Sequence, residues 1–176
     1  YEAPNAGGVL ALDSIEHDEV LYPFLIESRQ IAKDSSGAGQ WNGAPAAQGA
    51  YRSLSGEMTV AYRSDGDINV AKGVLGGLNG TAAKNAKRHA NGEEEPLPGF
   101  RIEVCKPQER MLFRSVAGGG YGDPTMRDPQ RVARDANRRW LSVEHAEKVY
   151  KVVLKLGDNG IDYLVDEART ATLRSA

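Results

Sequence analysis

The residues that could do chemistry in this chain are few and lie far apart in the sequence. The three histidines, His17, His89 and His145, show neither the H-x-H nor the H-E-x-x-H spacing that brings two imidazoles onto one metal ion. We interpret His145 as a surface residue of a helix and His89 as part of a solvated basic loop. His17 stands among acidic neighbours that could touch a cation, but a solvated surface segment is the favoured interpretation.

Nucleophiles are equally isolated. Cys105 is the only cysteine, so this chain can form neither an internal disulfide nor a cysteine-based zinc site of its own. It lies on an expected strand with no base beside it in the sequence, which is typical of a buried, inert thiol. Ser53-Leu-Ser-Gly56 is not the G-x-S-x-G nucleophile elbow. Glu27 and Arg29, two positions apart on a strand, share a face and could bind a polar ligand or pair with other charges. The catalytic residues therefore stay unknown.

The glycine-rich segments could hold a phosphate only if their spacing fitted. Neither Gly73–Gly80 nor Gly118–Gly122 gives G-x-G-x-x-G, because Asp123 stands where a third glycine is needed, and no G-x-x-x-x-G-K-[ST] occurs. Consecutive glycines instead permit positive φ and close chain approach, or a loop lying against a substrate or partner. Trp41 and Tyr121 stand in such loops and could cap the core edge or anchor an interface.

Short strands joined by glycine and proline turns dominate the chain up to about residue 116. The expected strands cover residues 21–31, 50–54, 57–63, 68–71, 100–106 and 111–116. Ser55-Gly56 predicts a hairpin between the second and third of them. Residues 81–98 are polar and charged, so we expect them to be exposed or mobile.

The pattern changes after Pro124. Asp128-Pro129 is a favourable helix opening, and Ser142 opens a second helix. A short strand at 152–154, a turn at 157–160 and a final helix over about 162–173 follow. We therefore expect an α+β fold that is mainly β, with a sandwich or barrel-like β domain over residues 1–124 and a helical C-terminal tail over 125–176 packing on it.

The bulk composition is that of an ordinary globular protein. The 176 residues are 40% hydrophobic and 26% charged, enough for a core of their own. A net charge of −2 argues against a general nucleic-acid footprint. With no apolar run of about 20 residues and no leader pattern at the start, we expect no membrane partner and a cytoplasmic location. Because the chain begins with Tyr1, it is either processed, a piece of a longer protein, or trimmed at its N-terminus.

Several stretches form an ordered set of motifs. The strand at 22–31 leads into Asp34–Gly43, which is similar to a D-S-G-G-A-G-x-x-x-G-G loop. Val116–Pro124 resembles a G-G-G-G-Y-G-D-P turn, and Arg127–Asp135 resembles an R-D-P…V…D stretch. Ser142–Leu154 is similar to an S-x-E-x-A…Y…V-V-L ending. In this order and spacing the motifs resemble the C-terminal region of the hydantoinase B/oxoprolinase family.

The resemblance implies a large ATP-dependent assembly. Such B-type subunits partner with a hydantoinase A-type, ATP-using subunit. Together they open cyclic amides such as hydantoins or 5-oxoproline or, in related enzymes, carboxylate acetone or acetophenone. It also implies that ATP and a divalent metal are bound by partner subunits, with no cofactor and no metal bound by this chain.

The chain also departs from the family pattern. A typical B-type subunit is several times longer, and Val9–Asp13 stands where the family often carries an H-T-H-M-like stretch. The expectation is therefore the C-terminal part of a split B-type chain in a cyclic-amide hydrolase complex, completing the fold and a subunit interface. Its partners would be the A-type ATPase and the remainder of the B-type subunit. A subunit of a ketone carboxylase and a noncatalytic scaffold protein are the alternatives. The candidate interface or substrate-loop residues are Arg29, Trp41, Tyr121 and Asp123.

Overall fold

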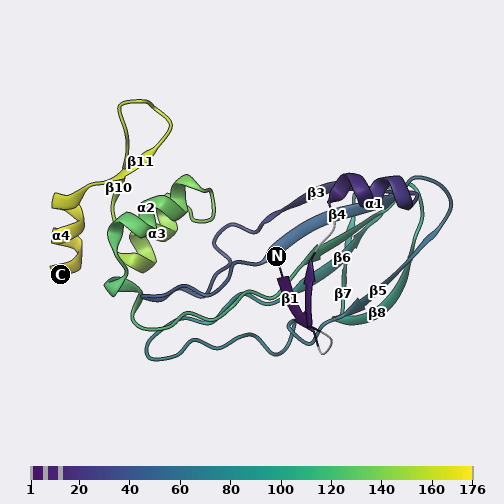
Figure 1. Ribbon diagram of the computed structural model, residues 1–176, viewed down its shortest axis with the longest axis horizontal. Coiled ribbons are helices and arrows are strands. Elements are labelled where there is room, and N and C mark those ends of the chain that lie inside the picture. The colour runs from purple at the N-terminus through teal and green to yellow at the C-terminus, as the bar shows by residue number, and fades with distance from the viewer. Residues whose placement is uncertain (1, 6–7, 12–13, 176) are drawn as a thin grey trace.

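The computed structural model describes residues 2–5, 8–11 and 14–175. The residues outside these ranges are Tyr1, Ala6, Gly7, Leu12, Asp13 and Ala176. The molecule is elongated (Figure 1). Most of the strands and one helix lie at one end, the other helices and a short pair of strands lie at the other, and long extended segments run between them.

The elements follow one another in a simple order. They are β1 (Glu2–Asn5), β2 (Gly8–Ala11), α1 (Ile15–Leu21), β3 (Phe24–Ile31), β4 (Ala47–Ser53), β5 (Met58–Arg63), β6 (Lys84–Arg88), β7 (Glu94–Leu97), β8 (Phe100–Cys105), β9 (Arg110–Arg114), the 3-10 turn η1 (Pro124–Met126), α2 (Pro129–Asn137), α3 (Val143–Tyr150), β10 (Leu154–Leu156), β11 (Tyr163–Val165) and α4 (Glu167–Ser175). None of the helices within the described ranges is long and apolar enough to cross a membrane.

Two antiparallel layers make up the β-rich end. The main sheet has the order β3-β4-β9-β6-β7, and β5 pairs with β8 in a separate two-stranded sheet. Buried Leu97, Cys105 and Met111 pack with side chains of β5 between the layers, and the Tyr62 hydroxyl donates a 3.1 Å hydrogen bond to the Leu112 carbonyl. The expectation of an α+β, mainly β fold is confirmed, as a sandwich and not a closed barrel.

Several local expectations were wrong. The hairpin around Ser55-Gly56 does not form, because β4 pairs with β3 and β9 whereas β5 pairs with β8. Residues 68–71 form no strand, and the strand expected from residue 21 starts only at Phe24 because helix α1 ends at Leu21. Ser14 caps that unexpected helix by accepting a hydrogen bond from the His17 N–H.

The stretch expected to be exposed or mobile, residues 81–98, contains β6 and β7. Its charges are ordered by partners that lie far away in the sequence. The buried Lys87 ammonium lies 3.2 Å from a Glu103 carboxylate oxygen and 3.1 Å from one of Glu109. It also donates a 2.8 Å hydrogen bond to the Val104 carbonyl. The polar composition of residues 81–98 does not by itself predict these contacts, because the partners of Lys87 lie outside this stretch.

Three glycine-rich segments, residues 34–44, 71–80 and 117–122, connect the two ends. They run side by side and exchange backbone hydrogen bonds, such as Gly37 N–H to Gly118 O at 2.9 Å and Gly120 N–H to Leu78 O at 2.9 Å. A Cβ on Gly120 would overlap the Ala38 backbone. The expected close chain approach is therefore found: glycine is required here because the neighbouring backbones occupy the space of a side chain.

The helical end has its own core. Tyr150, Val132 and Val152 are buried there together with Ala133, Ala136 and Ala146. The expected openings are confirmed, since Asp128 and Ser142 cap α2 and α3 with their side chains. The helix expected over 162–173 starts later, at Glu167, and β11 precedes it. The Asn137 side chain holds β11 through hydrogen bonds to the Tyr163 N–H and carbonyl.

Candidate functional site

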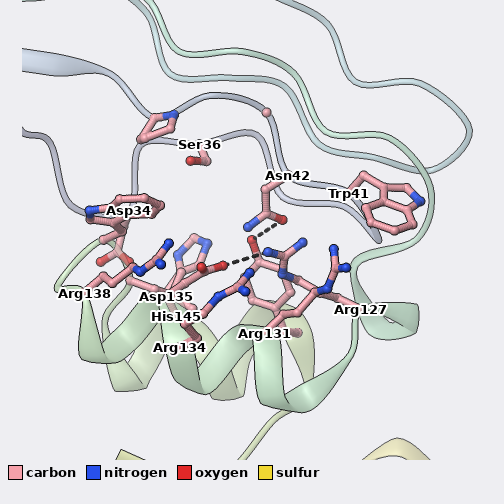
Figure 2. A pocket seen from close by; sticks show the side chains of 15 residues that line it. Asp34, Ser36, Trp41, Asn42, Arg127, Arg131, Arg134, Asp135, Arg138 and His145 are labelled. Atoms are coloured by element: carbon pink, nitrogen blue, oxygen red, sulfur yellow. Dashed lines mark hydrogen bonds and ion pairs between the residues drawn. The ribbon is translucent and has the colours of Figure 1, made fainter. Parts of the chain in front are cut away.

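A cavity of about 250 Å³ lies where the glycine-rich segment 34–44 meets helices α2 and α3. Figure 2 shows the loop with Ser36, Asn42 and Trp41 on one side and arginine side chains from α2 on the other. Its lining includes Asp34, Ser36, Trp41, Asn42, Arg127, Arg131, Arg134, Asp135, Arg138, Trp140, His145 and Tyr150. The site is therefore built by two segments about 100 positions apart in the chain.

Four arginines dominate the wall of the cavity. Arg131, Arg134 and Arg138 are three and four positions apart on or just after α2, so they lie on one face of the helix. Arg127 precedes the helix and is itself buried, 6% exposed. The sequence shows the spacing of these arginines on the helix expected after Asp128-Pro129. It does not show that the distant segment 34–44 faces them.

Arg127 is fixed by protein partners on two sides. Its Nη2 lies 2.7 Å from Oδ2 of Asp135, and its Nη1 donates a 3.1 Å hydrogen bond to the Gln40 carbonyl. The Nε of Arg127 is buried and has no hydrogen-bond partner. One donor of the guanidinium is thus left unused in a place where unsatisfied polar groups are costly.

The other arginines lie against aromatic rings. The Arg131 guanidinium carbon is 4.8 Å from the centre of the Trp41 ring, and that of Arg138 is 5.1 Å from the Trp140 ring. Within the described part of the chain, no carboxylate pairs with Arg131, Arg134 or Arg138. Cation–π contact orients a guanidinium plane without neutralising its charge.

The loop side of the cavity is held by specific hydrogen bonds. Asp34 adopts a left-handed conformation (φ 57°), its Oδ1 accepts a 2.7 Å bond from the Ser142 N–H, and its own N–H donates to the Trp140 carbonyl. The Tyr150 hydroxyl donates a 3.0 Å bond to Oδ1 of Asn42. Burial raises the pKa of Tyr150 to about 12, so this hydroxyl stays a neutral donor at physiological pH.

Of the four candidate residues, the structure brings two together. Trp41 and Tyr121 form an antiparallel bridge, with N–H to carbonyl bonds of 3.0 and 2.9 Å in the two directions. Both rings are about half exposed, at 52% and 50%. Only Trp41 lines the cavity.

The other two candidates have local roles. Asp123 accepts 2.8 Å hydrogen bonds from the N–H and the hydroxyl of Thr125 and so caps η1, and these bonds lower its pKa. Arg29 lies on β3 in the main sheet, where it interacts with the hydroxyl of Tyr51. Its expected neighbour Glu27 sits at a bulge and pairs with Arg52 and Arg110, both at 3.0 Å.

The structure confirms the expectation for Cys105 and contradicts those for His145 and His89. Cys105 is fully buried on β8, as expected, and burial raises the pKa of its thiol. His145 is not a surface residue, since it is half-buried and lines the cavity beside Tyr150. His89 is not in a solvated loop, since its ring nitrogens lie 3.1 Å from a Glu95 oxygen and 3.3 Å from a Glu109 oxygen.

A metal does not fit the residues that the structure describes, because no group of three or more histidine, cysteine, aspartate or glutamate side chains is placed to hold one. The cavity also presents no serine or cysteine paired with a base: its serine is Ser36, and no partner is found for that hydroxyl in the described ranges. Four arginines against two aspartates make the lining of the cavity cationic.

A model of the hydantoinase B/oxoprolinase family matches residues 4–124. The chain therefore belongs to the hydantoinase B/oxoprolinase family, and the resemblance seen in its motifs is confirmed.

Its relatives include subunits of larger enzymes. The chain is 31% identical over 173 residues to the caprolactamase subunit beta of Pseudomonas jessenii, an alignment that covers 96% of this chain and 29% of that protein. It is 28% identical over 195 residues to the acetone carboxylase alpha subunit of Xanthobacter autotrophicus, covering 89% of this chain and 24% of that one. The chain thus spans less than a third of the length of these relatives.

Solved structures show the same fold. The ATP-dependent caprolactamase from Pseudomonas jessenii superposes with a TM-score of 0.75 at 27% identity, over 96% of this chain and 29% of that chain. Nucleotide-free acetone carboxylase superposes with a TM-score of 0.74 at 26% identity, over 94% of this chain and 26% of the other.

Proposed function

We propose that this chain is the C-terminal part of a B-type subunit in an ATP-dependent cyclic-amide hydrolase complex. The observation that carries the proposal is the 31% identity to a caprolactamase subunit beta over nearly the whole chain. In this role the chain completes the fold of the B-type subunit and forms a subunit interface. Its partners are an A-type ATPase and the remainder of a B-type chain, and the complex works in the cytoplasm.

In this proposal, ATP and the divalent metal are bound by the remainder of the complex. One observation supports this division of labour for the nucleotide. The glycine-rich segments use their N–H groups to bond one another, as Gly118 N–H does with the Ala44 carbonyl. A phosphate-cradling loop needs free N–H groups, so these segments are suited to packing and not to nucleotide binding.

The outer face of the β5–β8 sheet supports a docking role. Phe100, Ile102 and Val104 alternate along β8 and are 72%, 72% and 40% exposed, and Ala61 lies opposite Ile102 in the register. Apolar strips of this kind on a sheet face mark interaction surfaces. We assign this face to the remainder of the B-type chain, because the relatives are more than three times as long as this chain.

A second candidate function is a subunit of an ATP-dependent ketone carboxylase. It is favoured by the 28% identity to the acetone carboxylase alpha subunit and by a TM-score of 0.74, close to that of the caprolactamase.

Reconstitution separates these functions. The chain is co-expressed with the remainder of a B-type subunit and an A-type subunit, and ATP turnover is measured with caprolactam, hydantoin or 5-oxoproline, and separately with acetone plus bicarbonate. Turnover stimulated by a cyclic amide is expected, and stimulation by acetone and bicarbonate alone would establish the second candidate. A stable isolated chain with amidase activity of its own would contradict both, and a chain that joins no complex would point to a scaffold.

A further inference from the structure

We propose that the cavity on the arginine face of α2 is a binding site for a compact dianion of the phosphate type. This goes beyond the proposed function, since it assigns a ligand to a site that the reaction of the complex does not define. It can be tested without ATP and without partner subunits.

The charge of the lining is unbalanced. Four arginines and two aspartates line the cavity, an excess of two positive charges without His145. Both carboxylates are already engaged, Asp135 by Arg127 and Asp34 by the Ser142 N–H. Like charges three and four positions apart destabilise a helix, so the bare chain bears an electrostatic cost on α2 that a bound dianion would remove.

The donors are arranged for an oxyanion. The Arg131 guanidinium is held over Trp41 and the Arg138 guanidinium over Trp140, which limits their rotation before any ligand arrives. Guanidinium groups bind phosphate and carboxylate oxygens with two parallel N–H bonds. Arg127, fixed by Asp135 and the Gln40 carbonyl, also lines the same wall. Figure 2 shows these side chains directed from the helix toward the loop.

The size of the cavity limits the ligand. Its volume of about 250 Å³ is below the range of roughly 300–1,000 Å³ that is usual for drug-sized ligands. A single phosphate group fits within this volume. Two excess positive charges match one dianion.

The experiment uses the chain's own fluorescence. Trp41 and Trp140 are its only tryptophans, and each stacks with an arginine of the site. The probe is inorganic phosphate, titrated at constant ionic strength against sodium chloride. A saturable change in tryptophan emission and a rise in the melting temperature are expected with phosphate only. A linear response, or the same response to chloride, would overturn the proposal.

The variants make the test specific. Arg131→Gln/Arg134→Gln is expected to weaken phosphate binding at least about tenfold, in line with the loss of charge-assisted hydrogen bonds. Lys148→Gln/Arg169→Gln removes the same two charges from exposed positions outside the cavity and is expected to bind as the parent does. If phosphate binding were weakened equally in both double variants, net charge alone would explain the binding, and the proposed site would be wrong. Circular dichroism verifies that each variant is folded, and Arg138→Gln serves as the second arginine variant.

Malonate distinguishes the source of the anion. It carries two carboxylates and mimics acidic side chains of a partner polypeptide. Tighter binding of phosphate than of malonate supports the proposal. Tighter binding of malonate would overturn it and assign the cavity to an acidic protein segment.

Discussion

Arg127 and Asp135 form a buried ion pair in which Nη2 and Oδ2 are 2.7 Å apart, with the side chains only 7% and 9% exposed. The pair joins the C-cap of η1, two residues before α2, to the second turn of that helix. Arg127 also reaches the Gln40 carbonyl of the glycine-rich segment. It therefore ties the helical end of the molecule to the long segments that lead to the sheets.

Removing the acid should be costly. We expect Asp135→Asn to lower the free energy of unfolding by about 3 kcal/mol, because a buried guanidinium would lose its counter-charge. Urea unfolding measures the change. Asp158→Asn, in an exposed turn, is the control and should change stability by less than about 0.5 kcal/mol. Equal stability of the two variants would contradict the role of the pair.

The glycine segments should not tolerate a methyl group. A Cβ at Gly120 would lie far closer to the Ala38 carbonyl than van der Waals contact allows. That carbonyl belongs to the backbone and cannot rotate away. We expect Gly120→Ala to cost about 3 kcal/mol in thermal or urea unfolding. Gly157→Ala, whose nearest neighbour would be 3.1 Å away, is the matched control and should be tolerated far better.

Stability should fall at alkaline pH. Burial raises the pKa of Tyr62 and of Tyr150 to about 12, against about 10 in an unfolded chain. Between pH 10 and 12 the unfolded chain loses these protons while the folded chain keeps them, so stability is present below pH 10 and is lost as the pH rises toward 12. Absorbance of phenolate, followed together with circular dichroism, checks this. Ionisation of all seven tyrosines near pH 10 without unfolding would contradict it.

The Trp41–Tyr121 bridge should matter for assembly more than for folding. Because both rings are about half exposed, Trp41→Ala and Tyr121→Ala should leave the melting temperature of the chain within a few degrees of the parent. As aromatic anchors they should each weaken complex formation by about 30-fold, the effect of a residue worth about 2 kcal/mol. Pull-down with the partner subunits measures this. Leu164→Ala, 52% exposed on β11, is the control, and weakening by that variant alone would refute the assignment.

The outer face of β8 should behave as an interface with the remainder of the B-type chain. Ile102→Asn is expected to fold, since the side chain is 72% exposed, but to lose co-purification with that remainder. Ile161→Asn, 77% exposed in the turn between β10 and β11, offers the comparison. If both variants co-purify equally well, this face is not the contact.

Much of the local structure could be read from the sequence. Asp128-Pro129 and Ser142 start helices because their side chains accept N–H bonds that the first turn leaves free. In β5, Met58, Val60 and Tyr62 alternate with Thr59, Ala61 and Arg63, and the burial of these residues follows the alternation. These features depend on neighbours within a few positions, so the sequence contains them directly.

Which strands pair, and which charges meet, was decided by the tertiary structure. Ser55-Gly56 predicted a hairpin, yet β4 and β5 belong to different layers: β4 pairs with β3 and β9, and β5 pairs with β8. The same holds for Lys87, whose charge is neutralised by Glu103 on β8 and by Glu109 in the turn between β8 and β9.

The sequence by itself determined the family, the order of the motifs and the need for glycine, because each rests on residue type and spacing. It did not determine the cationic cavity. Four arginines become one site only when α2 aligns them and the segment around Asn42, about 90 positions earlier, folds back to close the wall. A long-range contact of this kind depends on the whole packing of the chain, and no local pattern contains it.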